Sequence, residues 1–234
     1  MTDYVLIHGA FHGGWCWRKV SPLLEAAGHT AIAPDLPGHG VGEEKRPIAL
    51  EDYVEAVVGH LRRCQAPAVL VGHSMAGVVI AEAAERAPEL IRRLVFVAAY
   101  LPADGQSLDD LLRADPQSLV RVARGGADGF VAIRPDALVP ALYSGSPEDD
   151  VAFARARLVA QAIQPMKTPV RLTRQRFGRV PRTYIGCLRD RAITHALQIR
   201  MRTATPCERT IDLDCDHAPF FSAPRALVEA LLAE

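Results

Sequence analysis

The sequence lacks a net charge, because its 27 Lys and Arg residues are matched by 27 Asp and Glu residues. A chain with no excess of either sign has no long-range field to attract nucleic acid or an anionic membrane surface. Hydrophobic residues make up 49% of the 234 residues, which is enough for a sizeable core. We therefore expect a small, fairly neutral ligand as the partner, and neither nucleic acid nor membrane.

Cysteine is scarce and follows no pattern. The five cysteines form no C-x-x-C pair and are odd in number, which favours a reducing compartment over a disulfide framework. The first residues lack the basic start and long apolar run of a signal peptide. No segment reaches the roughly 20 apolar residues that span a bilayer. These absences predict a cytoplasmic protein with buried thiols.

Short apolar runs that end at Gly or Asp alternate with segments of helical periodicity. This alternation is typical of a parallel sheet covered by helices on both faces. Right-handed crossovers then give a doubly wound sheet, in a single domain over residues 1–234. We expect strands at residues 4–7, 30–33, 68–71, 94–98, 183–188 and 209–213, and helices at 17–27, 51–64, 77–87, 192–202 and 224–233.

The alternation stops between about residues 102 and 180. That stretch contains several prolines and short helical pieces such as residues 151–162, and no convincing run of core strands. Apolar residues continue throughout it, which argues against a solvated, disordered tail. We therefore expect a small inserted helical cap over one edge of the sheet.

A serine stands where the third expected strand ends, in Ala68-Val-Leu-Val-Gly-His-Ser-Met-Ala-Gly77. A nucleophile on a tight strand-to-helix turn needs small residues two positions before and after it, because neighbouring chains approach closely. Gly72 and Ala76 meet this need, although Ala76 replaces the usual glycine and Gly77 follows it. The pattern predicts that Ser74 is a catalytic nucleophile; the alternative is an ordinary helix-capping serine.

A serine hydroxyl needs a base, and the base needs an acid that holds its tautomer. On this turn the expected chain order is serine, acid, histidine, with both partners on loops after later strands. Asp190 follows the strand expected at 183–188, and His217 follows the one at 209–213. Asp104 is an alternative acid after the strand at 94–98, unless it serves as a turn or helix-capping residue.

An oxyanion needs two backbone donors, for which the N–H groups of Met75 and Ala10 are predicted. Ala10 lies in a glycine-rich loop, but the chain has neither G-x-G-x-x-G nor a P-loop lysine, which argues against a nucleotide. No acidic or cysteine spacing supports a metal site, so we expect no metal and no cofactor. The histidines that could otherwise form such a site are His8, His12, His39 and His73.

Several motifs appear in order: His8-Gly-Ala-Phe-His-Gly-Gly-Trp-Cys-Trp17, Asp35-Leu-Pro-Gly-His-Gly40, Gly72-His-Ser-Met-Ala-Gly77, Thr168-Pro-Val-Arg-Leu172, Pro181-Arg-Thr-Tyr-Ile185 with Asp190-Arg-Ala-Ile193, and Asp216-His-Ala-Pro-Phe-Phe-Ser-Ala-Pro224. Over nearly the whole chain they resemble the α/β-hydrolase group of plant methylesterases, such as the salicylate-binding esterase, and plant hydroxynitrile lyases. The resemblance implies an α/β-hydrolase core with a small cap, a triad of Ser74, Asp190 and His217, no cofactor, and a homodimer.

The lyases of that group differ from this chain at two positions. They carry threonine where this chain has Gly9, and after the catalytic histidine they carry a lysine, whose charge helps stabilise departing cyanide, where this chain has Ala218. The resemblance therefore points to a serine carboxylesterase for small, largely apolar esters, methyl or aryl. A lyase or other non-hydrolytic reaction and a receptor-like ligand-binding role stay open. Candidate pocket residues, each of which could equally be core packing, are Phe11, Trp15, Tyr100, Met166 and Phe220.

Overall fold

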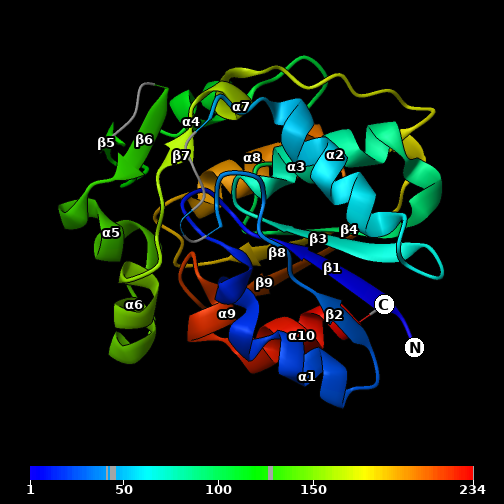
Figure 1. Cartoon of the computed structure of the whole chain (residues 1–234), viewed down its shortest axis with the longest axis horizontal. Coiled ribbons are helices and arrows are strands. Elements are labelled where there is room, and N and C mark those ends of the chain that lie inside the picture. Colours follow the sequence, from blue (N-terminus) through cyan, green and yellow to red (C-terminus); the bar gives the residue numbers. More distant parts are fainter. Residues whose placement is uncertain (41, 43–45, 126–128, 234) are drawn as a thin grey trace.

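A parallel sheet of six strands forms the centre of the computed structural model, which describes residues 1–40, 42, 46–125 and 129–233 (Figure 1). The strand order is β2-β1-β3-β4-β8-β9, and every neighbouring pair is parallel. All six predicted strands are confirmed. Their bounds are β1 Asp3–Ile7, β2 Thr30–Ile32, β3 Ala68–His73, β4 Ile91–Val97, β8 Arg182–Cys187 and β9 Arg209–Leu213.

Helices cover both faces of this sheet, which explains why its central strands are apolar without alternation. Three helices pack on one face: α2 (Leu50–Leu61), α3 (Ala76–Arg86) and α8 (His195–Ala204). The other face carries α1 (Ser21–Ala26), α9 (Pro219–Ser222), α10 (Pro224–Leu232) and the 3-10 helix η1 (Gly14–Lys19). The short 3-10 helix η2 (Pro88–Leu90) leads into β4. The expected doubly wound architecture is thereby confirmed.

The helix expected at residues 17–27 is wrong as a single element. The chain forms η1 up to Lys19 and then starts α1 at Ser21, with Pro22 in its first turn. Proline has no N–H to donate and its ring clashes with the preceding turn, so a helix begins there more readily than it continues through.

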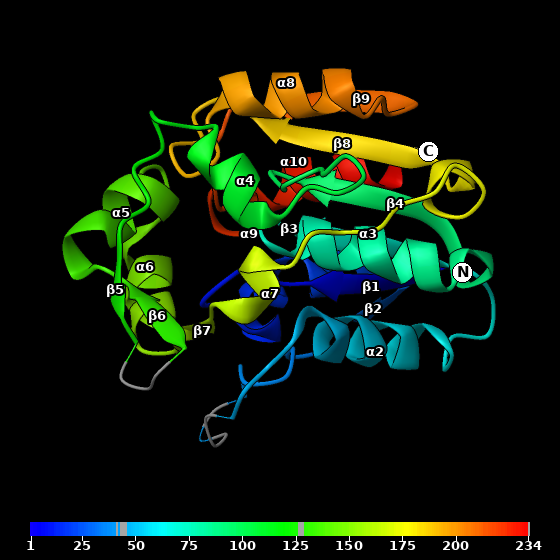
Figure 2. The same ribbon diagram turned by 90° about the horizontal axis from the view of Figure 1, so that it is seen from above.

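Residues 102–180 leave the central sheet, as expected, and contain more than short helices; residues 126–128 lie outside the described part. Most of this segment lies beyond the carboxyl ends of the strands (Figures 1 and 2). A small antiparallel sheet, β5-β6-β7, was not foreseen. The elements are α4 Leu108–Arg113, β5 Val122–Arg124, β6 Phe130–Ile133, α5 Pro135–Leu142, α6 Glu148–Arg155, β7 Gln161–Ala162, α7 Gln164–Lys167 and the 3-10 helix η3 Phe177–Arg179.

The helix expected at residues 151–162 is wrong in its second half. The helix α6 ends at Arg155, and Gln161 and Ala162 instead pair with Val131 and Phe130 as strand β7. Gln161 is fully buried and donates from Nε2 to the Tyr53 hydroxyl at 2.9 Å. A long-range pairing with β6 has therefore overridden the local helical pattern.

A buried ion pair ties this inserted segment to the core. Asp150 of α6 is 1% exposed and pairs with both Arg18 and Lys19 of η1. The Arg18 guanidinium also lies 4.2 Å from the centre of the Phe153 ring. A buried carboxylate needs such partners, since an unpaired buried charge is strongly destabilising. The contact holds α6 against the loop that follows β1.

Candidate active site

Ser74 sits on the turn between β3 and α3 in a left-handed conformation, with φ of 55°. A Cβ on Gly72 would lie 3.0 Å from the Ala76 carbonyl oxygen, so the strand and helix backbones meet there. A Cβ on Gly77 would lie only 1.9 Å from the Tyr100 oxygen. The closest approach of another backbone segment to this turn is therefore at Gly77 and not at residue 76. For this reason the turn accepts the methyl group of Ala76 where a glycine is usual.

His217 lies on the loop between β9 and α9 and is hydrogen-bonded to Asp190. The distance from His217 Nδ1 to Asp190 Oδ2 is 2.8 Å, and the two residues are 2% and 5% exposed. Asp190 Oδ1 accepts the backbone N–H groups of Ala192 and Ile193 at 2.7 and 2.9 Å. Burial raises the pKa of the Asp190 carboxyl, and the interaction with His217 partly opposes that rise.

His73, next to the serine, is linked to the loop that carries His217. Its Nε2 lies 2.8 Å from the carbonyl oxygen of His217, and since a carbonyl only accepts, this nitrogen carries the proton. Burial lowers the pKa of His73 well below its usual value, so the ring is neutral. The residue beside Ser74 thus positions the backbone of His217.

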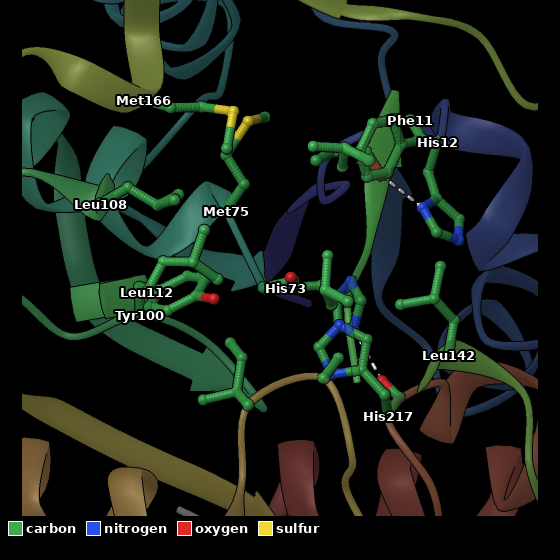
Figure 3. A pocket seen from close by; sticks show the side chains of 16 residues that line it. Phe11, His12, His73, Met75, Tyr100, Leu108, Leu112, Leu142, Met166 and His217 are labelled. Atoms are coloured by element: carbon green, nitrogen blue, oxygen red, sulfur yellow. Dashed lines mark hydrogen bonds between the residues drawn. The ribbon is translucent and has the colours of Figure 1, made fainter. Parts of the chain in front are cut away.

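Ser74 and His217 line the same cavity, which has a volume of about 110 Å³ (Figure 3). Ala10 and Met75 line it as well, so the structure brings the predicted nucleophile, base and backbone donors to one place. Three of the five candidate pocket residues also line it, namely Phe11, Tyr100 and Met166. Most of the remaining wall is aliphatic, as an apolar ligand requires.

Trp15 and Phe220 do not line this cavity, and the expectation that they would is corrected. The Trp15 ring stacks on His12 with centroids 5.3 Å apart. Phe220 is fully buried, and its ring centre lies 4.9 Å from that of His73. Both rings belong to an aromatic layer that supports the site from behind. The surrounding residues decide whether an aromatic side chain lines the cavity or packs behind it. The identity of a single residue in the sequence does not carry this information.

Sequence reasoning missed most of the wall that the inserted segment supplies. The only local signal lies in α4, where Leu108 and Leu112 are four residues apart and therefore share a helix face. Leu142 is the last residue of α5, and most of the other residues of the wall belong to loops and strand ends, where no periodicity marks them. The lining residues that were not predicted are His12, Leu108, Leu112, Val120, Val122, Leu142, Ala192 and Ile193, together with His73.

The loop after β1 packs directly against Ser74. A Cβ on Gly9 would lie 2.8 Å from Ser74 Cβ, so this approach requires glycine. His12 Nδ1 donates to the Ala10 carbonyl at 2.8 Å, and its Nε2 lies 2.6 Å from the Tyr143 hydroxyl. Within the described part of the chain, the N–H groups of Ala10 and Met75 donate to no other residue. Both are therefore free to bind an oxygen in the cavity.

Two further histidines of the group considered for a metal, His8 and His39, form hydrogen bonds. His8 Nε2 accepts the Leu36 N–H at 3.0 Å, and His39 Nδ1 donates to the His12 carbonyl at 2.6 Å. No cluster of His, Cys, Asp and Glu among the described residues could hold a metal ion. Asp104, the alternative acid, accepts the Leu172 N–H at 2.8 Å and serves a loop.

The burial of His12 predicts a loss of stability in acid. Burial lowers the pKa of His12 from 6.5 to about 4, so the unfolded chain takes up this proton first as the pH falls. The contribution of neutral His12 to the free energy of unfolding is complete above about pH 6.5. It is lost as the pH falls toward 4, at about 1.4 kcal/mol per pH unit for this group. Buried His8 and His73 act in the same direction.

Urea unfolding between pH 7 and 4.5 measures this effect, with His12→Gln as the comparison. As the pH is lowered, the free energy of unfolding should fall less steeply in the variant. The difference in slope should correspond to the uptake of at most one proton on unfolding. Equal slopes in the two proteins would contradict the assignment of a neutral, buried His12.

No helix in the described ranges combines the length and apolarity needed to cross a membrane. The family model described as the alpha/beta hydrolase family matches residues 4–230. Putative methylesterase 11, chloroplastic, of Arabidopsis thaliana is 36% identical over 99% of this chain. The chain spans 63% of that relative's length.

Methyl jasmonate esterase 1 of Vitis vinifera is 30% identical over 94% of this chain and 92% of that protein. Among solved structures, polyneuridine aldehyde esterase superposes with a TM-score of 0.90 at 24% identity, over 99% of this chain and 98% of that one. At this identity the superposition supports the fold alone. The matched family model, the relatives and the observed sheet agree, and the chain belongs to the α/β-hydrolase family.

Proposed function

We propose that this protein is a serine carboxylesterase that hydrolyses small, largely apolar esters, methyl or aryl, through an acyl-enzyme. The observation that carries the proposal is the hydrogen bond of 2.8 Å between His217 and Asp190, with His217 and Ser74 on the wall of one apolar cavity. Two relatives are named as a putative methylesterase and a methyl jasmonate esterase, which supports methyl esters as a substrate class.

In this proposal each side chain of the site has a role. Asp190 accepts a hydrogen bond from the protonated Nδ1 of His217, which leaves His217 Nε2 without a proton and able to act as the base. That base takes the proton of Ser74 as its oxygen attacks the ester carbonyl. His217 then returns the proton to the leaving alcohol, and a water activated by the same nitrogen releases the acid and restores Ser74.

The N–H groups of Ala10 and Met75 would hold the oxyanion of each tetrahedral intermediate. Each such donor contributes about 3 kcal/mol to lowering the barrier in comparable sites. His8 Nδ1 donates to the Gly9 carbonyl at 2.9 Å, and this carbonyl shares its peptide plane with the Ala10 N–H. The peptide geometry that aims these donors is therefore built before any substrate binds.

Two features favour hydrolysis over cyanide release. Gly9 faces Ser74 so closely that a threonine Cβ would lie 2.8 Å from Ser74 Cβ. Ala218, which follows the base, is 1% exposed and carries no charge that could stabilise a departing anion. A lyase would need a positive group at that place.

A panel of esters graded by acyl and alcohol size tests the proposal. Methyl and aryl esters of short acids should be hydrolysed by the purified protein, with rates that fall once the acyl group outgrows the cavity. Acid release in a pH-stat is the measurement, and mandelonitrile is included with a cyanide assay. Cyanide release without ester hydrolysis would contradict the proposal, as would tight binding of every ester without turnover.

We also propose that the protein is cytoplasmic and assembles as a homodimer. The first rests on the unpaired cysteine pattern and the second on the family resemblance alone. Light scattering of the purified protein measures its assembly, and a monomer at micromolar concentration would contradict the second proposal.

A further inference from the structure

A tyrosine hydroxyl without a hydrogen-bond partner faces the cavity. Tyr100 follows β4, is 5% exposed and lines the cavity beside the nucleophile. Its hydroxyl points into the open middle of the cavity (Figure 3) and forms no hydrogen bond with any described residue. Because this hydroxyl is open only to the cavity, a substrate that fills the cavity covers it, and it then needs an acceptor on the substrate.

The backbone of Tyr100 is locked to the turn that carries the nucleophile. Its N–H donates to the Ser74 carbonyl at 3.1 Å, and its own carbonyl oxygen lies against Gly77. The side chain is therefore held in a fixed place relative to Ser74. A hydroxyl held in this way can select among substrates. Only a substrate whose second acceptor lies at the right distance from its ester carbonyl can bond to the hydroxyl while that carbonyl lies at Ser74.

Of the other polar side chains of the cavity, Ser74 and His217 belong to the proposed reaction, and the buried Nδ1 of His73 has no hydrogen-bond partner in the described ranges. Both ring nitrogens of His12 have partners, and His73 Nε2 donates to the His217 carbonyl. Burial raises the pKa of Tyr100, so its hydroxyl keeps its proton and acts as a donor at neutral pH. The rest of the described wall is apolar: Ala10, Phe11, Met75, Leu108, Leu112, Val120, Val122, Leu142, Met166, Ala192 and Ile193.

We propose that Tyr100 is a specificity-determining residue, and that its hydroxyl donates a hydrogen bond to a second oxygen of the substrate. The preferred substrate is then a small apolar ester with one ether or carbonyl oxygen apart from the ester group. An analogue with CH2 in place of that oxygen leaves the hydroxyl buried and unpaired, and the site rejects it. This inference rests on the proposed esterase function.

Pairs of esters that differ by one oxygen test it against the Tyr100→Phe variant. Methyl ethoxyacetate and methyl 3-methoxypropanoate are each compared with methyl pentanoate, and 2-methoxyethyl acetate with butyl acetate. The ratio of kcat/KM between oxygen and carbon members is measured in both proteins, so that intrinsic reactivity cancels. In at least one pair the ratio should be about tenfold higher in the wild type.

Tyr53→Phe is the matched control, because it also removes a buried tyrosine hydroxyl. That hydroxyl bonds to Gln161 and His39, and Tyr53 does not line the cavity. The control should keep the oxygen-to-carbon ratios of the wild type. Equal ratios in wild type and Tyr100→Phe for every pair would overturn the inference. A uniform loss on all esters would also overturn it, since the hydroxyl would then act on the ester group itself.

Binding separates this inference from the proposed function. The same ester pairs are titrated into Ser74→Ala with and without Tyr100→Phe, and the affinities are compared by calorimetry. If the wild type hydrolyses no ester, the proposed function fails, yet a tenfold preference for the oxygen member that disappears with Tyr100→Phe supports the inference. No such preference in binding overturns it.

Discussion

Ser74→Ala is expected to lower kcat for ester hydrolysis by about 10⁵-fold while the fold stays intact. The substitution removes the oxygen that would form the acyl-enzyme, and no other hydroxyl is held by the same turn. The backbone at this position has φ of 55°, a strain that serine and alanine share, so stability should change little. Turnover of a 4-nitrophenyl ester and the thermal unfolding midpoint are the two measurements.

Ser21→Ala provides the control for this substitution. Ser21 begins α1, which packs on the face of the sheet opposite α3, and it does not line the cavity. Its loss should leave turnover unchanged. A folded Ser74→Ala protein that hydrolyses esters at the wild-type rate would refute the assignment of the nucleophile.

Asp190→Asn should lower kcat by about 10³- to 10⁴-fold, with a much smaller effect on KM. An asparagine can turn its NH2 group toward His217, which favours the tautomer with the proton on Nε2, where the base must be free. The shape of the side chain is retained, so its oxygen can still accept the N–H groups of Ala192 and Ile193. Steady-state kinetics and circular dichroism together separate a chemical defect from unfolding.

Asp104→Asn is the matched variant at the alternative acid. Because Asp104 accepts the Leu172 N–H at 2.8 Å, its replacement should affect a loop and leave kcat within a few-fold of wild type. If Asp104→Asn were the variant that lost activity and Asp190→Asn were not, the assignment of the acid would be reversed.

The central sheet was predictable because its signals are local. The inner strands β1 and β3 are short apolar runs, and β3 is buried along its whole length, whereas the edge strand β9 is partly exposed. Burial on both faces removes the alternation that would have confused these strands with surface strands. The same locality explains Ser74, because Gly72 marks the close approach of the strand to Ala76 of the following helix, only four residues along the chain.

The inserted segment was harder to predict because distant partners decide its structure. The strand β7 contains two residues and exists only because β6 lies beside it. The strand β5 is exposed throughout, so no hydrophobic pattern marks it. Apart from Met166, the wall of the cavity that comes from this segment was missed for the same reason.

The five candidate pocket residues divided according to their packing. Phe11, Tyr100 and Met166 line the cavity, whereas Trp15 and Phe220 lie in the layer behind it. Residue type was the same in both groups, since large apolar side chains suit a core as well as a pocket. The role of Tyr100 could be inferred only from its unpartnered hydroxyl, which is a property of the folded chain.

The account depends on an activated oxygen at Ser74, and covalent trapping tests this most directly. Diethyl 4-nitrophenyl phosphate should react with Ser74, so that a bond forms from Oγ to phosphorus and 4-nitrophenolate is released. The substitution His217→Ala should greatly slow this reaction. Peptide mass spectrometry of the inactivated protein is predicted to locate a single diethyl phosphoryl group on Ser74. Inactivation with the group on another residue, or full labelling of Ser74 at an unchanged rate in His217→Ala, would contradict the account.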